Sequence, residues 1–301
     1  AVPIMAMATK HLGFGVTVNL TYDHPFIMAR RLSTLDHLTG GRFGWNIVAG
    51  FVDSGARAIG LDRMRAHDER YDMADEYMEV VYKLWEGSWD DDAVVRDKAN
   101  RIYARKDKVR RIDHTGANFK VSAVHMCEPS PQRTPVLYQA GASTRGRVFA
   151  GRHAECVFIT SFTKEMVKNH VADIRRQAVL QGRAAGDVAA IVGSTVITAK
   201  TDAEAQRKYE DVKTYLDVKG SLCVFAALAG VDFSKYDPDD PIEYLKTDAN
   251  QSFLERATVL SKGRKWRIRD LTAFHPDSPT AGVFLVGSPK TIADAMIEWV
   301  E

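Results

Sequence analysis

Length, composition and charge exclude several classes of protein at the outset. The chain has 301 residues, of which 45% are hydrophobic, and a net charge of +2, so it can bury a large core and lacks the single-signed field of a nucleic-acid binder. The three cysteines (Cys127, Cys156 and Cys223) are odd in number and far apart, which favours neither a disulfide framework nor a C-x-x-C metal site. We therefore expect one globular domain in a reducing cytoplasm.

The beginning of the chain adds two expectations. It lacks the basic region and long apolar stretch of a signal peptide, and the sequence has no apolar run long enough for a membrane span. It also lacks an initiator methionine, so we expect a processed, trimmed or partial product.

Strand and helix signals alternate through the first part of the chain. Residues 12–18 read as a buried strand, and Pro25 begins a helix that the Gly40-Gly41 pair closes. Residues 42–49 form the next predicted strand. After a loop, apolar residues at spacings of three and four predict a long amphipathic helix over about 67–85.

The alternation then resumes after an interruption. Residues 87–134 are charged and turn-rich, with short β-like pieces, and we interpret them as an insertion. Strands and helices follow in turn, and a second insertion is predicted at 219–265 with a helix near 251–260. The chain ends with a short apolar stretch and a helix that Ser288 caps. The predicted later strands are 135–140, 155–160 and 191–198, and the predicted helices between and after them are 141–151, 163–181 and 202–216.

Alternating strands and helices of this spacing predict an α/β fold with a parallel sheet. Five strand–helix units are countable, which fits a doubly wound open sheet, whereas an eight-stranded barrel needs three more strands. Periodicity does not choose between the two. No G-x-G-x-x-G turn follows a predicted strand, so the sequence shows no nicotinamide site.

The pair His67 and Tyr71 opens the long helix. Residues four apart near the first turn can point the same way, beside free backbone N–H groups and the positive end of the helix dipole. A phosphate or another anion suits that position. The alternative is that His67 caps the helix and Tyr71 belongs to the core.

Other polar residues follow predicted strands, at the sheet edge where α/β folds gather their sites. Thr17 and Asn19 end the first strand, Asn46 lies in the second, and Gly141–Ser143 follow the strand at 135–140. Ser143 is either a simple N-cap or, with Arg145 and Arg147, part of an anion site. The histidines show no metal-ligand spacing and no G-x-S-x-G elbow is present, which leaves His24, His125 and His170 as candidate acid–base groups.

Four long segments, taken together, resemble the bacterial luciferase-like flavin monooxygenases, in the branch of nitrilotriacetate, dibenzothiophene-sulfone and long-chain alkane monooxygenases. They are TKHLGFGVTVNLTYDHPFIMARRLSTLDHLTGGRFGWNIV, HDERYDMADEYMEVVYKLWEGSW, EPSPQRTPVLYQAGASTRGRVFAGRHAECVF and VGSPKTIADAM. The resemblance implies a (β/α)8 TIM barrel with insertions at about 87–134 and 219–265. Residues 1–301 are then expected to be a single, partial barrel domain that lacks its first two strands and its last.

The resemblance also implies a function. Such proteins bind reduced FMN, which reacts with O2 to a flavin hydroperoxide that oxygenates a small aliphatic, sulfur- or nitrogen-containing compound, and a separate NAD(P)H:flavin reductase supplies the FMNH2. By matching motif positions, Thr17 and Asn46 are expected near the flavin ring, and His67, Tyr71 and Ser143, with Gly141 and Ala142, at the FMN phosphate and ribityl chain. No metal and no catalytic residue are assigned. We expect a cytoplasmic homo-oligomer with no nucleic-acid or membrane partner.

One departure from the family pattern bears on the substrate. Ala49-Gly50 stand where the family commonly has Thr-Ser, which predicts a changed substrate pocket. Two other functions remain open: a deazaflavin-dependent oxidoreductase of the same superfamily, and a non-catalytic flavin-binding protein.

Overall fold

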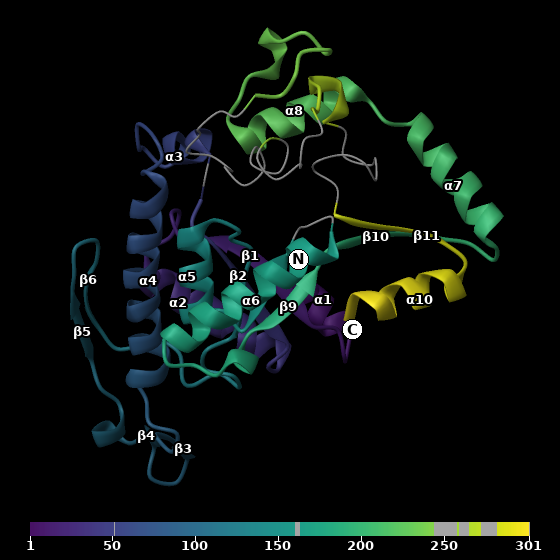
Figure 1. Cartoon of the computed structure of the whole chain (residues 1–301). Helices are drawn as coiled ribbons and strands as arrows, with labels where there is room; N and C mark the ends of the chain where they lie inside the picture. Colours follow the sequence, from purple (N-terminus) through teal and green to yellow (C-terminus); the bar gives the residue numbers. More distant parts are fainter. Residues whose placement is uncertain (51, 160–162, 244–257, 259–264, 272–281, 301) are drawn as a thin grey trace. The chain divides into compact units, whose positions relative to one another are not determined.

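The computed structural model describes residues 1–50, 52–159, 163–243, 258, 265–271 and 282–300, and Figure 1 shows its helices and strands. The helices are α1 (Val2–Ala8), α2 (Pro25–Thr39), α3 (Asp53–Ala58), α4 (His67–Gly87), α5 (Thr144–His153), α6 (Lys164–Leu180), α7 (Asp202–Thr214), α8 (Val218–Ala229) and α10 (Pro289–Val300). The strands are β1 (Phe14–Asn19), β2 (Phe43–Val48), β3 (Val94–Asp97), β4 (Ile102–Ala104), β5 (Ile112–Thr115), β6 (Lys120–Ala123), β7 (Val136–Gln139), β8 (Cys156–Ile159), β9 (Ala189–Val192), β10 (Ser194–Thr198) and β11 (Val283–Gly287). Short 3-10 helices are η1 (Lys106–Lys108), η2 (Ala185–Asp187), η3 (Phe233–Lys235) and η4 (Ile268–Asp270).

The largest sheet has five strands in the order β1-β2-β7-β8-β9. The pairs β1–β2, β2–β7 and β7–β8 are parallel, as are β10 and β11 in a separate two-stranded sheet. The predicted parallel α/β architecture is therefore confirmed. The hairpins β3–β4 and β5–β6 are antiparallel.

One predicted strand is divided. The sequence predicts a single strand over 191–198, but β9 and β10 belong to different sheets and meet at Gly193. The Gly193 N–H donates to the carbonyl of Ile159 at the end of β8, whereas its carbonyl accepts from Val283 at the start of β11, both at 3.3 Å. The chain changes pairing partner at this glycine, which hydrophobic periodicity does not reveal.

The chain forms two compact units. One comprises Ala1–Gly141, Val148–Val157 and Ala178–Ala189, and the other comprises Ala142–Arg147, Phe158–Gln177 and Ala190–Glu301. The single barrel domain and the limits of its two insertions stay predictions. Among the described helices, none has the length and apolar character that crossing a membrane requires.

The core of the first unit lies between the sheet and the helices α2 and α4. On α4 the predicted apolar face is confirmed, because Ala74, Met78, Val81 and Trp85 are all buried. Trp45 of β2 is fully buried against α4, with its ring 6.3 Å from that of Trp85 in an edge-on contact. The helix therefore covers one face of the sheet and leaves the other to the polar residues described below.

The insertion predicted at 87–134 contains both hairpins, and the β5–β6 hairpin lies beside α4 (Figure 1). Its return to the sheet is fixed by Arg133, whose guanidinium donates to the carbonyls of Trp85 and Trp89 at 3.2 and 3.0 Å. The short helix α3, in the loop between β2 and α4, has no strong periodicity and was not predicted.

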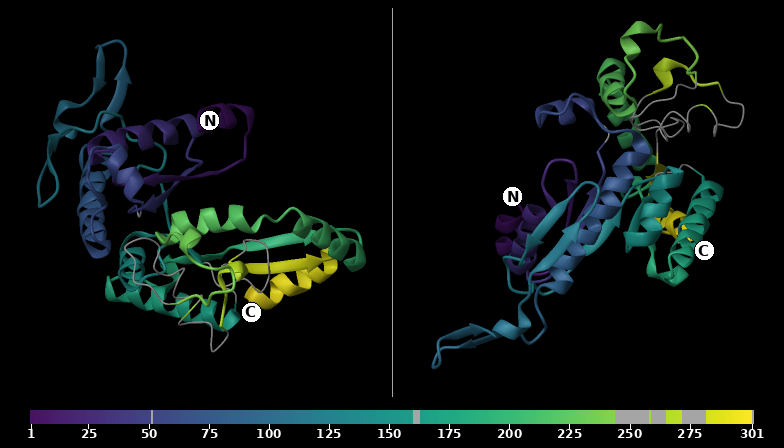
Figure 2. Two further views of the ribbon diagram at one scale, coloured as in Figure 1. Left: turned by 90° about the horizontal axis from the view of Figure 1, so that it is seen from above. Right: turned by 90° about the vertical axis from the view of Figure 1, so that its left-hand side faces the viewer.

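In the second unit, β10 and β11 lie side by side with α7 and α10 next to them (Figure 2). Ser288 caps α10 as predicted, since its Oγ accepts from the N–H of Thr291 at 3.4 Å. Helix α8 carries a small apolar cluster built from Phe225, Phe233 and Leu271 with their neighbours. The helix predicted near 251–260 falls outside the described residues, apart from residue 258.

Gly44 of β2 provides a test of the sheet's packing. A Cβ atom at this position would lie 2.5 Å from the Tyr138 ring and 3.2 Å from the Val136 carbonyl oxygen, so we expect Gly44→Ala to lower the free energy of unfolding by about 1–2 kcal/mol. Gly15, the register partner of Gly44 on β1, has open space at its Cβ position, and Gly15→Ala is the matched control. Urea unfolding of both variants checks this, and equal stabilities would refute the packing argument.

Candidate functional site

A row of polar side chains crosses four neighbouring strands. Thr17 of β1 is in register with Asn46 of β2, Asn46 with Tyr138 of β7, and Tyr138 with Cys156 of β8. Residues in register on parallel strands point to the same side of a sheet. This polar row therefore lies on the face opposite to Trp45 and the helix-packed core.

The structure brings together the first two predicted site residues. Asn46 Nδ2 donates to Thr17 Oγ1 at 2.9 Å. The other atom of that amide, Asn46 Oδ1, is buried and has no hydrogen-bond partner within the described parts of the chain. A buried acceptor without a donor is costly, so this oxygen is suited to receive an N–H or O–H group from a ligand.

A second group of predicted residues meets at the first turn of α4. The rings of His67 and Tyr71 are 5.3 Å apart, and Tyr71 also packs on Phe149 of α5 at 5.6 Å. A Cβ atom at Gly141 would lie only 2.8 Å from Tyr71 Oη, so the absence of a side chain there gives the hydroxyl its place beside the backbone. His67, Tyr71 and Gly141 thus form one cluster.

The first turn of α4 has no side-chain cap. The N-cap residue is Ala66, whose methyl side chain cannot accept a hydrogen bond from the first N–H groups, and His67 is the first residue of the helix. The alternative interpretation of His67 as the cap is therefore wrong. His67 Nδ1 lies 2.7 Å from Asp68 Oδ1, which orients the ring; in its protonated form the ring can also donate from Nε2 to an anion.

Ala142 and Ser143 belong to the second unit and directly precede α5. Ser143 Oγ accepts from the N–H of Gly146 at 3.1 Å, so this serine is an N-cap. The Arg147 guanidinium of α5 donates to the Ala142 carbonyl and forms an ion pair with Asp173 of α6. These contacts fix the turn before α5. Whether Ala142 and Ser143 also contact a cofactor phosphate stays a prediction.

The departure at Ala49-Gly50 has a local explanation. Gly50 has a φ of 81°, and a Cβ atom there would lie 3.0 to 3.1 Å from side-chain atoms of Asn19, Thr21 and Met64. This backbone favours glycine and has little room for a serine. The Ala49 carbonyl accepts from Thr21 Oγ1 at 3.3 Å, which ties the loop to the end of β1.

Two of the candidate acid–base histidines have structural roles. His24 caps α2, because its Nδ1 accepts from the N–H of Phe26 at 3.3 Å, and His125 is buried against Ser33. One residue missed by sequence reasoning is Gln139, which is buried and accepts from the N–H of Gly141 at 2.7 Å. It shapes the turn beside Tyr71, and only the strand alternation at 136–139 hints at its burial.

A parallel β/α fold with a polar row on one sheet face, and with a helix start that has no side-chain cap, is typical of a ligand-binding protein of the α/β class. Comparison with known families makes this specific. The family described as luciferase-like monooxygenase matches residues 3–301, and the chain belongs to that family. The (β/α)8 barrel is the fold of the family, as the resemblance implied.

Named relatives extend the comparison. The chain is 46% identical over its whole length to dimethyl-sulfide monooxygenase of Hyphomicrobium sulfonivorans, and 44% identical over 99% of its length to long-chain alkane monooxygenase of Geobacillus thermodenitrificans. It matches the crystal structure of riboflavin lyase with modified FMN and riboflavin at a TM-score of 0.89 and 38% identity, covering 99% of this chain and 65% of that one. The chain spans 62% and 63% of the lengths of the first two relatives.

Proposed function

We propose that the protein is the oxygenase of a two-component flavin monooxygenase, which uses reduced FMN and O2 to oxygenate a small organic compound. The observation that carries the proposal is the meeting of His67, Tyr71 and Gly141 at the uncapped start of α4, in a chain of this family. Relatives named for dimethyl sulfide and long-chain alkanes support an aliphatic or sulfur-containing substrate.

The residues fit both ends of FMN. At the phosphate end, the N–H groups at the start of α4 and the His67 and Tyr71 side chains are donors suited to an anion. At the ring end, the unpartnered Asn46 Oδ1 suits an N–H group of the isoalloxazine, with Thr17 holding the amide in place. We propose Ala142 and Ser143 as further contacts of the ribityl phosphate.

Bound in reduced form, FMN supplies the electrons that activate O2. This chain's residues bind and orient the cofactor and fix the position of donors around it. The polar row places the Tyr138 hydroxyl group and the Cys156 thiol group on the same sheet face as Asn46. We propose that a separate NAD(P)H:flavin reductase supplies the reduced cofactor, because the chain lacks a nicotinamide fingerprint; a relative carrying the name component A agrees with such a division of labour.

The test is an anaerobic titration with reduced FMN. We expect the His67→Ala/Tyr71→Phe variant to bind FMN at least about tenfold more weakly than the parent, because it loses two donors to the phosphate. The matched control is His11→Ala/Tyr215→Phe, in which an exposed histidine and an exposed tyrosine are changed in the same way. Equal losses in both variants, or a parent chain that binds only a deazaflavin, would contradict the proposal.

Activity is the second arm of the test. In the presence of a flavin reductase, the protein should consume O2 in response to sulfides or alkanes. Tight FMN binding without turnover on any such compound would favour a non-catalytic flavin-binding protein.

A further inference from the structure

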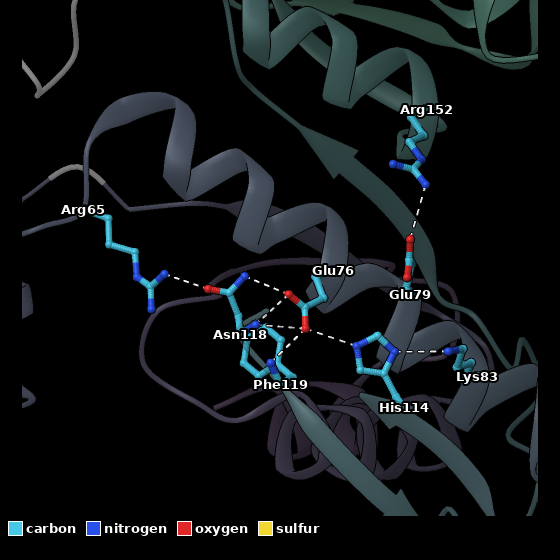
Figure 3. A network of polar contacts seen from close by, with 8 residues as sticks. All are labelled: Arg65, Glu76, Glu79, Lys83, His114, Asn118, Phe119 and Arg152. Atoms are coloured by element: carbon cyan, nitrogen blue, oxygen red, sulfur yellow. Dashed lines mark hydrogen bonds and ion pairs between the residues drawn. The ribbon is translucent and has the colours of Figure 1, made fainter. Parts of the chain in front are cut away.

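The Glu76 carboxylate of α4 accepts several hydrogen bonds from the turn of the β5–β6 hairpin (Figure 3). It accepts from the N–H groups of Asn118 and Phe119, each at 2.8 Å, and from Asn118 Nδ2 at 2.7 Å. The Phe119 ring packs edge-on against Tyr77 of α4 at 5.5 Å. The turn of the hairpin is therefore fixed on α4 through backbone, side chain and ring.

A buried histidine of the hairpin, His114, also contacts Glu76. His114 lies between Lys83 Nζ, 3.1 Å from its Nδ1, and Glu76 Oε1, 3.1 Å from its Nε2 (Figure 3). An ammonium group only donates, so Nδ1 accepts and the proton is on Nε2, from which it is donated to Glu76. The Glu76 carboxylate thus has donors from three residues of the hairpin, His114, Asn118 and Phe119.

Asn118 connects Glu76 to the segment that precedes α4. While its Nδ2 donates to Glu76, its Oδ1 accepts from the Arg65 guanidinium at 2.7 Å (Figure 3). The Arg65 carbonyl in turn accepts from the buried Arg70 guanidinium at 2.7 Å. Arg65 is thus fixed by its side chain and by its backbone, one residue before the N-cap.

We infer that Glu76, Asn118 and Arg65 are positioning residues for the first turn of α4, and that the insertion hairpin thereby sets the place of His67 at the phosphate of the flavin. The inference rests on the proposed function for the identity of the ligand. Because Ala66 provides no side-chain cap, this turn lacks the hydrogen bond that usually restrains the start of a helix from fraying. The hydrogen bond from Arg65 to Asn118 supplies the missing restraint from the side of the hairpin.

Two arginines in the same segment give a matched pair of variants. Arg65→Ala removes the hydrogen bond to Asn118, whereas Arg63→Ala removes the same charge two residues earlier from an exposed position. Amide hydrogen exchange at residues 64–69, measured without flavin, should be faster in Arg65→Ala and unchanged in Arg63→Ala. Arg65→Lys, which can still donate to Asn118 Oδ1, should restore most of the protection.

The second readout separates the phosphate end of the ligand from the ring end. Arg65→Ala should weaken the binding of FMN about fivefold and leave the binding of riboflavin, which lacks the phosphate, unchanged. A loss that is equal for FMN and riboflavin, or equal in Arg63→Ala, would overturn the inference, as would unchanged exchange at residues 64–69.

Failure of the two proposals can be told apart. If the parent chain bound neither flavin, the proposed function would fail, and the exchange data alone would decide whether these residues hold the turn. If the parent bound both flavins and Arg65→Ala behaved like the parent in both measurements, the proposed function would stand and the positioning role would fall.

Discussion

Replacing Glu76 by alanine is expected to lower the free energy of unfolding by about 3–4 kcal/mol. The side chain is only 12% exposed and accepts hydrogen bonds from Asn118, Phe119 and His114. Truncation leaves these donors without their acceptor and frees the hairpin turn from α4. Urea unfolding at neutral pH measures the change.

Glu79 is the matched control on the same helix. It is 48% exposed, and its ion pair with Arg152 is 3.6 Å long, so Glu79→Ala should cost no more than about 0.5 kcal/mol. If the two alanine variants were equally stable, the Glu76 contacts would contribute nothing beyond a surface charge.

The same carboxylate has a predictable dependence on pH. Burial raises the pKa of Glu76, but the hydrogen bonds from Asn118, His114 and Phe119 outweigh it and lower the pKa to about 2. Its contribution to stability is therefore present above the ordinary pKa of a glutamate and is lost as the pH falls toward 2. The stability difference between the parent and Glu76→Gln should shrink over that range.

His125 is expected to make the protein less stable as the pH falls from neutral toward 4. The side chain is 3% exposed; burial, with a smaller contribution from His37, lowers its pKa from 6.5 to about 4. On acidification the imidazole is therefore protonated in the unfolded chain before it is protonated in the folded chain. This difference lowers the free energy of unfolding by about 3 kcal/mol in full, and by about 2 kcal/mol between about pH 7.5 and about pH 5. In the fold, His125 Nε2 is hydrogen-bonded to Ser33 Oγ. Within the described residues Nδ1 has no hydrogen-bond partner, so an N–H group formed there by protonation would have no acceptor.

The measurement is urea unfolding at both pH values for the parent and for His125→Gln. The variant should lose about 2 kcal/mol less than the parent on acidification. His11→Gln, at an exposed position, is the control and should follow the parent. The pKa of the buried His153 is also lowered, so part of the pH dependence will remain in the His125 variant. Identical pH dependence in parent and His125→Gln would show that His125 is freely protonated in the fold.

Local signals explain which elements could be predicted. Helix α2 begins at Pro25, and Gly40, with a left-handed φ of 62°, caps its end at Thr39. Both limits could therefore be predicted from neighbouring residues. Strand pairing is not local, which is why the division at Gly193 and the partners within each hairpin could not be predicted. Barrel and open sheet also have the same periodicity, and the resemblance to a family decided between them.

The contacts of the candidate site were likewise predictable where they are local in sequence and not predictable where they are not. His67 and Tyr71 are one helical turn apart, and their proximity follows from helix geometry alone. The contact of Thr17 with Asn46 depends on strand register, and that of Glu76 with Asn118 joins residues 42 positions apart. A carboxylate in an amphipathic helix normally indicates a solvated face, so nothing near Glu76 in the sequence marked it as an anchor.

The polar row across β1, β2, β7 and β8 limits how this protein can tolerate insertions. A shift of one residue in any of these strands reverses which side chains face each side of the sheet. In β2 such a slip would turn Trp45 out of the helix-packed core and Asn46 into it. Length changes within these four strands should therefore be rare among functional variants of the protein, and indels should accumulate in the connecting loops instead.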